Sequence, residues 1–381
     1  MSEIRVNSLG NESNTGGPEL SGITEFSGQQ YFIPPKGTTA QRPSGCPAGS
    51  VRFNTDTEHL EYFNGSVWLE FEASIVELGG SLTGAATTFS TNGTGTRGLF
   101  AGGNAPDLKN EIEYISISTL GNTQDFGDLT DPKTGTAGCA SGTRGIFSNA
   151  ATPTRTNDID FVTFASTGDA ADFGDSTTSV AYRGALSNST RGVIGGGEQP
   201  NGTAVDIIDY ITIASTGSAK DFGDLLGNRV NPTGGASSVR GIFAGGSGDD
   251  EIMYITISST GNAQDFGDLL AGAIAITGCS NSTRCVFGGI RNPGYVTDME
   301  FVTIASLGNA IDFGDQTNNR GGAGGAASST RGVWGGGYGH PAFRNTIDYV
   351  EIPTTGNAID FGDMTYTADR LAGCSNGHGG L

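Results

Sequence analysis

Residues 184–225 read GALSNSTRGVIGGGEQPNGTAVDIIDYITIASTGSAKDFGDL, and this stretch recurs in altered form along most of the chain. The tetrapeptide DFGD occurs six times, at intervals of 44 to 49 residues, and begins at Asp125, Asp172, Asp221, Asp265, Asp312 and Asp360. An arginine, usually within Thr-Arg-Gly, keeps the same register at Arg97, Arg144, Arg191, Arg240, Arg284 and Arg331. Two markers that hold one register six times indicate a tandem repeat of about 47 residues.

Each repeat divides into four strand-sized segments. The segment after the arginine is an apolar run that ends in glycines, as at Val193–Gly197. The next, as at Tyr210–Ile213, alternates aromatic or hydroxyl side chains with aliphatic ones, and this period of two is typical of a strand. No segment has helical periodicity over ten residues. Four short strands in each repeat are typical of a propeller blade.

The glycines that end the second strand and the aromatic third strand resemble those of kelch repeats. The kelch tryptophan of the fourth strand is absent, and the phenylalanine of DFGD stands where an aromatic side chain would fill the blade. We therefore expect an all-β chain in which residues 77–381 form a six-bladed kelch-like β-propeller. Leu371–Asn376 or Ala85–Ser90, two further segments like a first strand, would close the ring and remove its exposed edges.

Residues 1–76 do not repeat and form the second expected domain, a small β-hairpin module. We predict strands at Val51–Asn54, Leu60–Phe63 and Val67–Phe71, with a hairpin turn at Asn64-Gly65. The segment from Gly49 to Trp68 resembles a module of tail-fibre and other structural proteins of tailed phages, G-x-x-R-F-N-T-D-T-x-x-L-E-x-Y-N-G-x-x-W. The matching residues are Gly49, Arg52, Phe53, Asn54, Thr55, Asp56, Thr57, Leu60, Glu61, Asn64, Gly65 and Trp68. The preceding Pro34–Ser50 also resembles structural proteins of marine cyanophages. The resemblance implies a virion component.

Composition excludes several other classes of protein. With 40 acidic against 20 basic residues the net charge is −20, which disfavours binding to nucleic acid. The five cysteines and three histidines show no zinc-ligand spacing. No signal peptide and no apolar stretch of about 20 residues occurs, so we expect neither secretion nor membrane insertion.

The repeated arginines and aspartates invite three interpretations. DFGD binds magnesium in kinases, but the glycine-rich loop, the strand lysine and the HRD motif of kinases are absent. The excess of carboxylates over arginines leaves Ca²⁺ binding as an alternative, although no dense D-x-D-x-D-G loop occurs. We favour structural ion pairs between the repeated arginines and the first aspartates of DFGD, because the planar guanidinium suits carboxylates.

The phenylalanine of DFGD is expected to pack between blades. The glycine triplets (Gly195–Gly197, Gly335–Gly337) are expected at close blade contacts.

Variable loops follow the second strand of each repeat and should share one face of the ring, where binding residues usually lie. The loops are Asn104–Asn110, Ala150–Asp158, Glu198–Val205, Ser247–Asp250, Arg291–Thr297 and Tyr338–Asn345. Aromatic or polar residues suited to carbohydrate or protein contact are Asn201, Asn292, Tyr295, Tyr338, His340 and Phe343. No grouping of Ser, His and Asp or of Cys and His predicts an enzyme, no cofactor is expected, and the S-x-D-x-G-x-T-W boxes of sialidases are absent.

These observations predict a phage virion protein, assembled in the host cytoplasm. Residues 1–76 would anchor it to other virion proteins, and the propeller would act as an adhesion or host-recognition head in a tail fibre, baseplate or capsid-attached appendage. The expected partner is a host surface glycan or protein. We also expect a homo-oligomer, with a trimer among the alternatives. A capsid or neck decoration protein, a glycan-degrading tailspike-type enzyme and a host-encoded lectin-like propeller remain the competing interpretations.

Overall fold

The computed structural model describes residues 34–56, 59–70, 96–289 and 294–381. The chain separates into two compact units, Met1–Ile75 (unit 1) and Val76–Leu381 (unit 2). The fold is all-β, as predicted: within the described residues the single helical element is a short 3-10 turn, η1 (Thr39–Gln41). None of the helices among these residues is long and apolar enough to cross a membrane.

Unit 1 is a four-stranded sheet in the order β1-β2-β3-β4. Its strands are β1 (Lys36–Gly37), β2 (Val51–Asn54), β3 (His59–Phe63) and β4 (Trp68–Glu70). The Asn64-Gly65 hairpin prediction is confirmed: the Asn64 side-chain oxygen accepts hydrogen bonds from the backbone N–H groups of Ser66 and Val67, and Gly65 has a φ of 102°. The short β1, which pairs in parallel with β2, was not predicted.

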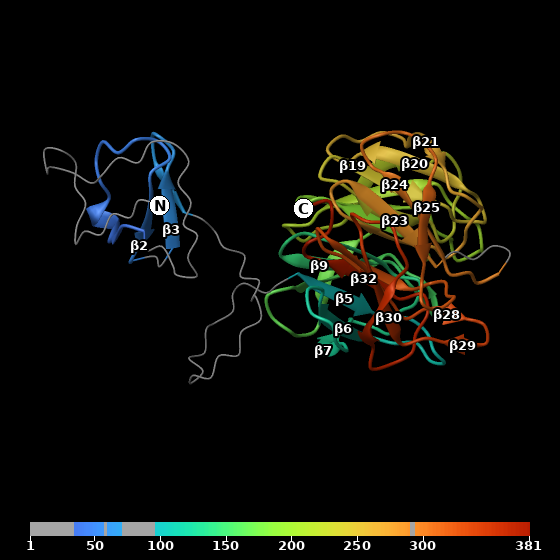
Figure 1. Cartoon of the computed structure of the whole chain (residues 1–381). Coiled ribbons are helices and arrows are strands. Elements are labelled where there is room, and N and C mark those ends of the chain that lie inside the picture. The colour runs from blue at the N-terminus through green and yellow to red at the C-terminus, as the bar shows by residue number, and fades with distance from the viewer. Residues whose placement is uncertain (1–33, 57–58, 71–95, 290–293) are drawn as a thin grey trace, which may run out of the picture. The chain divides into compact units, whose positions relative to one another are not determined.

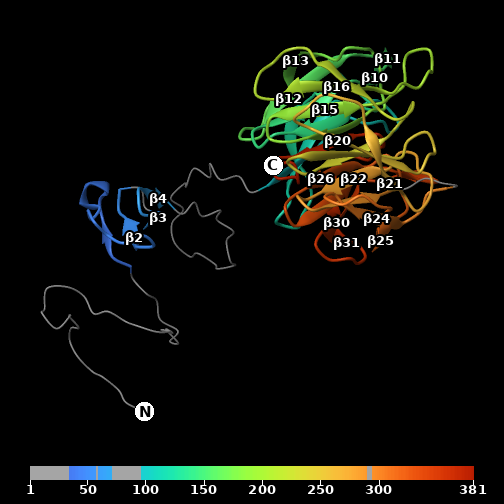
Figure 2. The ribbon, with the colours of Figure 1, turned by 90° about the horizontal axis from the view of Figure 1, so that it is seen from above.

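Unit 2 contains six four-stranded antiparallel sheets, which we number 1 to 6 in chain order (Figures 1 and 2). In each, the fourth strand carries DFGD. Sheet 1 is β32 (Ala372–Ser375), β5 (Arg97–Ala101), β6 (Glu111–Ser116) and β7 (Gln124–Asp128); sheet 2 is β8 (Ala137–Ala140), β9 (Arg144–Ser148), β12 (Asp158–Thr163) and β13 (Ala171–Asp175); sheet 3 is β14 (Gly184–Ser187), β15 (Arg191–Gly195), β16 (Ile207–Thr212) and β17 (Lys220–Asp224); sheet 4 is β18 (Thr233–Ala236), β19 (Arg240–Ala244), β20 (Glu251–Thr256) and β21 (Gln264–Asp268); sheet 5 is β22 (Thr277–Ser280), β23 (Arg284–Gly288), β24 (Asp298–Thr303) and β25 (Ile311–Asp315); sheet 6 is β26 (Gly324–Ala327), β27 (Arg331–Gly335), β30 (Thr346–Glu351) and β31 (Ile359–Asp363).

The first and last of the strands described in unit 2, β5 and β32, meet in sheet 1. The C-terminal strand β32 pairs with β5, with Cys374 opposite Leu99. The first strands contact one another in the cyclic order β8, β14, β18, β22, β26, β32 and back to β8. In Figure 2, β22 and β26 lie in the middle of unit 2, whereas β13, β25 and β31 lie at its margin. Of the two spare segments that we considered, Leu371–Asn376 therefore contains the first strand of sheet 1, and Ala85–Ser90 lies outside the described residues.

The fourth strand also helps to join each sheet to the next. The DFGD phenylalanines are 2 % exposed in every sheet, and Phe126 of sheet 1 packs against Val162 and Phe164 of sheet 2, so the predicted packing between sheets is confirmed. The glycine that follows leaves no room for a side chain. A Cβ on Gly223, whose φ is +147°, would lie 2.6 Å from the backbone of Gly261 in the next sheet.

The glycine triplets also lie where sheets approach closely, as predicted. A Cβ on Gly335 of sheet 6 would lie 3.0 Å from the Phe100 ring of sheet 1, and one on Gly196 would lie 2.8 Å from the Arg229 carbonyl oxygen. A phosphate-binding loop is not needed to explain these glycines.

Candidate binding face

The variable loops connect the second and third strands and contact the segments that lead into the first strands. The backbone N–H of Asn104 donates to the Asp369 carbonyl, and that of Glu198 donates to the Ala181 carbonyl. Two loops contain small hairpins, β10 (Ala151–Thr152) with β11 (Thr154–Arg155), and β28 (Tyr338–Gly339) with β29 (Ala342–Phe343). The loops and the entries to the first strands thus lie at the same end of the sheets, and we call this end the loop face.

Four of the predicted binding residues, three of them with aromatic six-membered rings, come together in one cluster on the loop face. The ring centroids of Tyr295 and Tyr338 are 5.3 Å apart, and those of Tyr338 and Phe343 are 5.0 Å apart. Tyr338 and Phe343 face each other across the β28–β29 hairpin, while Tyr295 comes from the loop of sheet 5. The Tyr338 hydroxyl lies 3.3 Å from Nδ1 of His340, whose ring is exposed. We call Tyr295, Tyr338, His340 and Phe343 the aromatic cluster.

Backbone contacts hold the aromatic cluster in place. Tyr338 forms an antiparallel bridge with Gly321 in the segment that enters sheet 6. A Cβ on Gly339 would lie 2.0 Å from the Asn319 carbonyl oxygen, which shows how closely the hairpin lies on that segment. Arg344 Nη2 donates to the Asn319 side-chain oxygen at 3.3 Å. Half-buried rings with amide, imidazole and guanidinium groups beside them can both stack on a ligand and form hydrogen bonds to it.

The other two predicted loop residues do not join this cluster in the described structure. Asn201 lies in the loop of sheet 3, where its side-chain oxygen accepts a hydrogen bond from the Thr203 N–H and stabilises a turn. Asn292 lies outside the described residues.

The repeated arginines do not pair with the DFGD aspartates, which corrects our prediction. Among the described residues, only Arg331 of the six has a carboxylate within 4 Å, that of Glu351. Each guanidinium instead donates from Nη1 to a main-chain carbonyl at the end of the third strand of the next sheet, over 2.6 to 3.2 Å. The pairs are Arg97–Phe164, Arg144–Ile213, Arg191–Ile257, Arg240–Ile304, Arg284–Ile352 and Arg331–Ile117.

The aromatic side chain of the third strand explains why these arginines do not pair with the DFGD aspartates. Each of these arginines lies 4.6 to 4.8 Å from the centroid of a third-strand ring, as Arg191 does over Tyr210. That ring in turn meets the DFGD phenylalanine edge-to-face at 5.7 to 6.2 Å, as Tyr210 meets Phe222. The first aspartate of each DFGD is exposed and stays hydrated, so pairing with it would contribute little stability. The stack of arginine, aromatic ring and phenylalanine (the repeat stack) is structural.

A different set of buried charges joins the sheets, and the sequence analysis missed it. The residue before the third-strand aromatic is at most 3 % exposed in every sheet; these residues are Glu113, Asp160, Asp209, Met253, Glu300 and Asp348. In three sheets a cation from the segment entering that sheet binds the carboxylate: Lys133 to Asp160 at 2.6 Å, Arg183 to Asp209 at 2.6 Å and Arg320 to Asp348 at 2.8 Å. Burial lowers the pKa of Arg183 and of Arg320, and the adjacent carboxylate opposes that shift.

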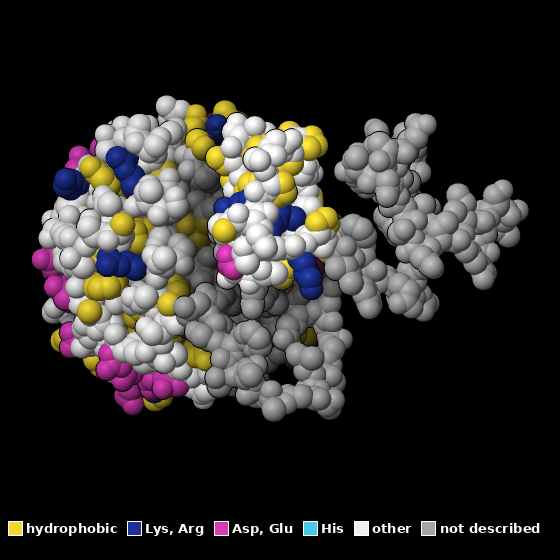
Figure 3. All heavy atoms as spheres, turned by 90° about the vertical axis from the view of Figure 1, so that its left-hand side faces the viewer, with side chains coloured by type: hydrophobic (Ala, Val, Ile, Leu, Met, Phe, Trp, Pro, Cys, Tyr) yellow, Lys and Arg dark blue, Asp and Glu magenta, His cyan; other side chains and the backbone are white. Residues whose placement is uncertain are grey.

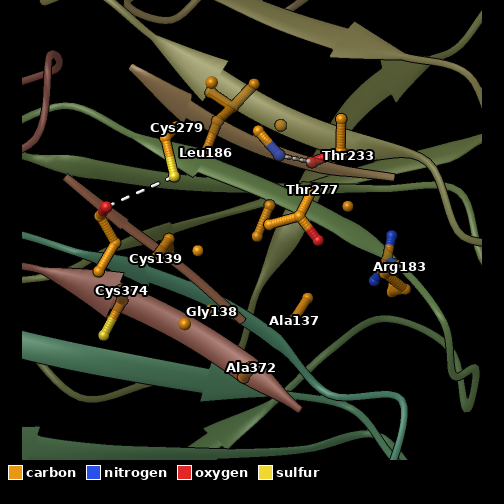
Figure 4. Close-up of a pocket in the computed structure, with 18 of the residues that line it drawn as sticks. Ala137, Gly138, Cys139, Arg183, Leu186, Thr233, Thr277, Cys279, Ala372 and Cys374 are labelled. Carbon is orange, nitrogen blue, oxygen red and sulfur yellow. Dashed lines mark hydrogen bonds between the residues drawn. The ribbon is translucent and has the colours of Figure 1, made fainter. Parts of the chain in front are cut away.

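A cavity of about 150 Å³ lies between the first strands of all six sheets (Figure 4). Cys139, Cys279 and Cys374 line it and are buried. Burial raises the pKa of Cys139 and of Cys279 to about 12, so both thiols stay protonated and are poor nucleophiles. Within the described ranges, no three His, Cys, Asp or Glu side chains gather to hold a metal ion.

His378 borders the same cavity and lies 3.2 Å from the Ser187 hydroxyl. Its Nδ1 accepts a hydrogen bond from the Gly380 N–H, so in the neutral ring Nε2 carries the proton and donates to the Ala140 carbonyl at 2.9 Å. The Ser187 hydroxyl also donates to that carbonyl. Burial lowers the pKa of His378, which favours this neutral form. Because Nε2 is already protonated, this pair cannot act as a base and a nucleophile.

The loop face with its aromatic cluster is therefore the best candidate for a binding site in the described residues. No protein-family model matches this chain, and a search of curated proteins finds no match either.

Proposed function

We propose that this chain is a structural protein of a tailed-phage virion in which unit 2 is a six-bladed kelch-like β-propeller that binds a host surface glycan. Residues 1–76 would attach it to other virion proteins. The virion assignment depends on the resemblance of Gly49–Trp68 to the phage module. The binding assignment depends on the loop face.

The cyclic contacts among the first strands support the propeller. A further line of support comes from the margin of unit 2, where the N–H groups of Gly121 and Thr123 in sheet 1 donate to the Phe361 and Asp363 carbonyls of sheet 6. Two equivalent hydrogen bonds join sheets 1 and 2: the N–H groups of Gly168 and Ala170 donate to the Phe126 and Asp128 carbonyls. Sheet 6 therefore contacts sheet 1 in the same way as consecutive sheets contact each other.

The aromatic cluster is the observation that carries the adhesion function. Three rings from two loops meet at Tyr338, whose ring centroid lies 5.3 Å from that of Tyr295 and 5.0 Å from that of Phe343. Rings suit the apolar faces of sugars, and the neighbouring His340 and Arg344 supply donors for hydroxyl or carboxylate groups. The surrounding four-stranded sheets hold the loops rigidly, which lowers the entropic cost of binding.

Binding of the purified chain to bacterial surface polysaccharides, immobilised from a panel of candidate hosts, tests this function. We expect Tyr338→Ala to weaken binding at least tenfold, because it removes the central ring of the cluster, and to leave the melting temperature nearly unchanged. Asn201→Ala, in the equivalent loop of sheet 3, is the matched control and should bind like the parent chain. Equal binding by both variants would exclude the aromatic cluster as the site. Release of new reducing ends from the polysaccharide would instead favour a glycan-degrading enzyme.

Antibody labelling of purified phage particles in the electron microscope tests the virion assignment separately. Label on the fibres or tail tip is expected. Label confined to the head or neck would favour a decoration protein, and the absence of label on intact particles would contradict the virion assignment.

A further inference from the structure

The cavity between the first strands has a floor at the end away from the loop face. Residues 376–381, which we call the strap, follow β32 and cross the far ends of the first strands. His378 donates to the Ala140 carbonyl of sheet 2 at 2.9 Å, and the Gly379 N–H donates to the Ser280 carbonyl of sheet 5 at 2.8 Å. The strap therefore forms the floor of the cavity, and the other end of the cavity lies at the loop face.

Six residues at equivalent positions surround the cavity where it reaches the loop face. Each lies two residues before a first strand, lines the cavity and has a left-handed backbone conformation, with φ between 55° and 68°. The six, which we call the mouth, are Gly135, Tyr182, Asn231, Ala275, Gly322 and Arg370. Hydrogen bonds join their main chains, as from the Tyr182 N–H to the Gly135 carbonyl at 2.8 Å and from the Arg370 N–H to the Gly322 carbonyl at 2.7 Å. The mouth thus has the same backbone conformation in all six sheets.

Two of the mouth residues keep bulky side chains in a backbone conformation that favours glycine. Sheets 2 and 6 carry glycine at this position, as the conformation favours. Tyr182 has a φ of 61° and Arg370 a φ of 55°, angles that bulky residues rarely adopt. Backbone strain of this kind gathers where a side chain serves a function. The polar side chains of the mouth are therefore candidates for binding.

These side chains present hydrogen-bond donors that the protein does not use. In the described part of the chain, the Tyr182 hydroxyl, the Asn231 amide and both Nη groups of Arg370 have no hydrogen-bond partner. The Arg370 side chain is 42 % exposed, and its Nε lies 3.8 Å from Asp369. Its guanidinium carbon lies 5.4 Å from the centroid of the Tyr182 ring. Arg155 lies at the same distance from that ring and is paired with a carboxylate. Arg370 is thus the cation of the mouth whose Nη groups are available to a ligand.

The cavity has no acidic lining. Of the described residues that line it, Arg183 and Arg370 are cations and none is Asp or Glu, although the chain contains 40 acidic residues (Figure 4). Asp209 neutralises Arg183 from outside the lining. Figure 3 shows Asp and Glu side chains gathered along the margin of the visible surface of unit 2, the larger body. An anion that reaches the mouth therefore meets donors and a guanidinium rather than carboxylates.

We infer that the mouth binds the anionic group of an acidic sugar, with a carboxylate or phosphate on Arg370 and the Tyr182 hydroxyl. A guanidinium fork forms two parallel hydrogen bonds to either group. The cavity of about 150 Å³ has the volume of one that holds a single benzene molecule, so no more than one ring of the ligand can enter it. The inference rests on the proposed function, since the acidic sugar would be one residue of the host glycan, and it names an acidic glycan as the class that the loop face binds.

Isothermal titration calorimetry of the full chain with glucuronate, glucose 6-phosphate and glucose tests the inference. We expect at least one of the two acidic sugars to bind at least tenfold more tightly than glucose, and we expect added salt to weaken that binding. The acidic sugar that binds distinguishes a carboxylate from a phosphate.

Arg370→Gly should weaken this binding at least tenfold, because it removes the guanidinium. Since Gly135 and Gly322 occupy the same backbone position, the variant should fold and melt like the parent chain. Ala275→Gly is the matched control: it makes the same backbone change in sheet 5 but removes no polar group, so its affinity should equal that of the parent chain.

Equal affinity for glucose and for both acidic sugars, or no binding of either acidic sugar, would overturn the inference. So would binding that Arg370→Gly leaves unchanged. Retention of host polysaccharide by a chain that fails these tests would leave the proposed function in place with a neutral glycan. Binding of an acidic sugar that Arg370→Gly abolishes, in a chain that retains no host polysaccharide, would support the anion site and contradict the proposed function.

Discussion

Sheets 3 and 5 carry an acidic side chain at the same buried position and neutralise it in different ways. In sheet 3, Asp209 is bound by Arg183, whose other N–H groups donate to the Gly196, Ile194 and Ile207 carbonyls. In sheet 5, Glu300 is 1 % exposed and the segment that enters the sheet offers it only the Leu270 N–H, at 2.6 Å. Burial therefore raises the pKa of Glu300 to about 7.

Sheet 4 shows a third arrangement, which explains the other two. There the position is occupied by Met253, whose sulfur accepts a weak hydrogen bond from the Leu226 N–H at 3.4 Å. The position thus offers an acceptor to the entering segment. A cation binds that acceptor in sheets 2, 3 and 6, whereas Glu113 of sheet 1 accepts hydrogen bonds from Thr123 and Thr365. Replacing a whole buried ion pair by apolar residues costs little net stability, whereas removing one partner leaves an uncompensated buried charge.

Breaking the ion pair of sheet 3 should have the largest effect. Arg183→Leu leaves the Asp209 carboxylate buried without a cation, and we expect it to lower the free energy of unfolding by about 3–5 kcal/mol. The double variant Arg183→Leu/Asp209→Met copies the arrangement of sheet 4 and should recover most of that loss. Denaturant titration followed by circular dichroism measures both. A double variant as unstable as the single one would show that the arginine acts through its carbonyl contacts and not through the charge.

Glu300 should make sheet 5 sensitive to pH in the opposite sense to an ion-paired carboxylate. Its folded pKa of about 7 lies above the ordinary 4.5, so the folded state holds the proton more tightly between those values, and stability falls as the pH rises through this window. The loss above pH 7 is at most about 3 kcal/mol. Glu300→Gln should therefore be more stable than the parent chain at pH 8 and equal to it near pH 4.5.

Melting temperatures between pH 4.5 and 8.5 check this prediction. Glu351→Gln, which replaces an exposed carboxylate of sheet 6, is the control and should follow the pH profile of the parent chain. If the Glu300→Gln variant lost stability with rising pH as the parent chain does, other carboxylates would have to cause the pH dependence. Asp128, whose pKa is raised by burial and by Asp169, would be the next to test.

The sequence predicted the repeating parts of the fold and missed the variable ones for a physical reason. The register of DFGD and of the arginine located the strands, the loops and the buried phenylalanine, because each repeat presents the same backbone to the next. The cations that bind the buried carboxylates keep no such register. Lys133 and Arg320 follow the start of their DFGD by 8 residues, but Arg183 follows its own by 11. The acidic residue before each third-strand aromatic was the available signal.

The repeated arginines were found but given the wrong partner, because spacing cannot distinguish a carboxylate from a carbonyl oxygen. The aromatic cluster was predicted only as separate residues. Their meeting depends on the β28–β29 hairpin and on a loop of the neighbouring sheet. These loops differ in length and sequence from repeat to repeat, so the repeat register does not predict the contact.

Arg191→Ala should give the smallest effect and sharpens the contrast between the two kinds of cation. Arg191 donates to the Ile257 carbonyl at 3.0 Å and lies 4.7 Å from the Tyr210 ring centroid, and it has no buried carboxylate to leave unpaired. The loss of one hydrogen bond and one cation–π contact should cost about 1–2 kcal/mol, well below the loss for Arg183→Leu. Lys220→Ala, at an exposed site on β17 of the same sheet, is the control and should change the unfolding free energy little. An Arg191→Ala variant as stable as the parent chain would mean that the repeat stack holds sheets 3 and 4 together through its rings alone. A loss of unfolding free energy as large as that for Arg183→Leu would mean that the hydrogen bond and the ring contact do not account for what Arg191 contributes. The expected difference between cations that neutralise a buried carboxylate and cations that stack on a ring would then be contradicted.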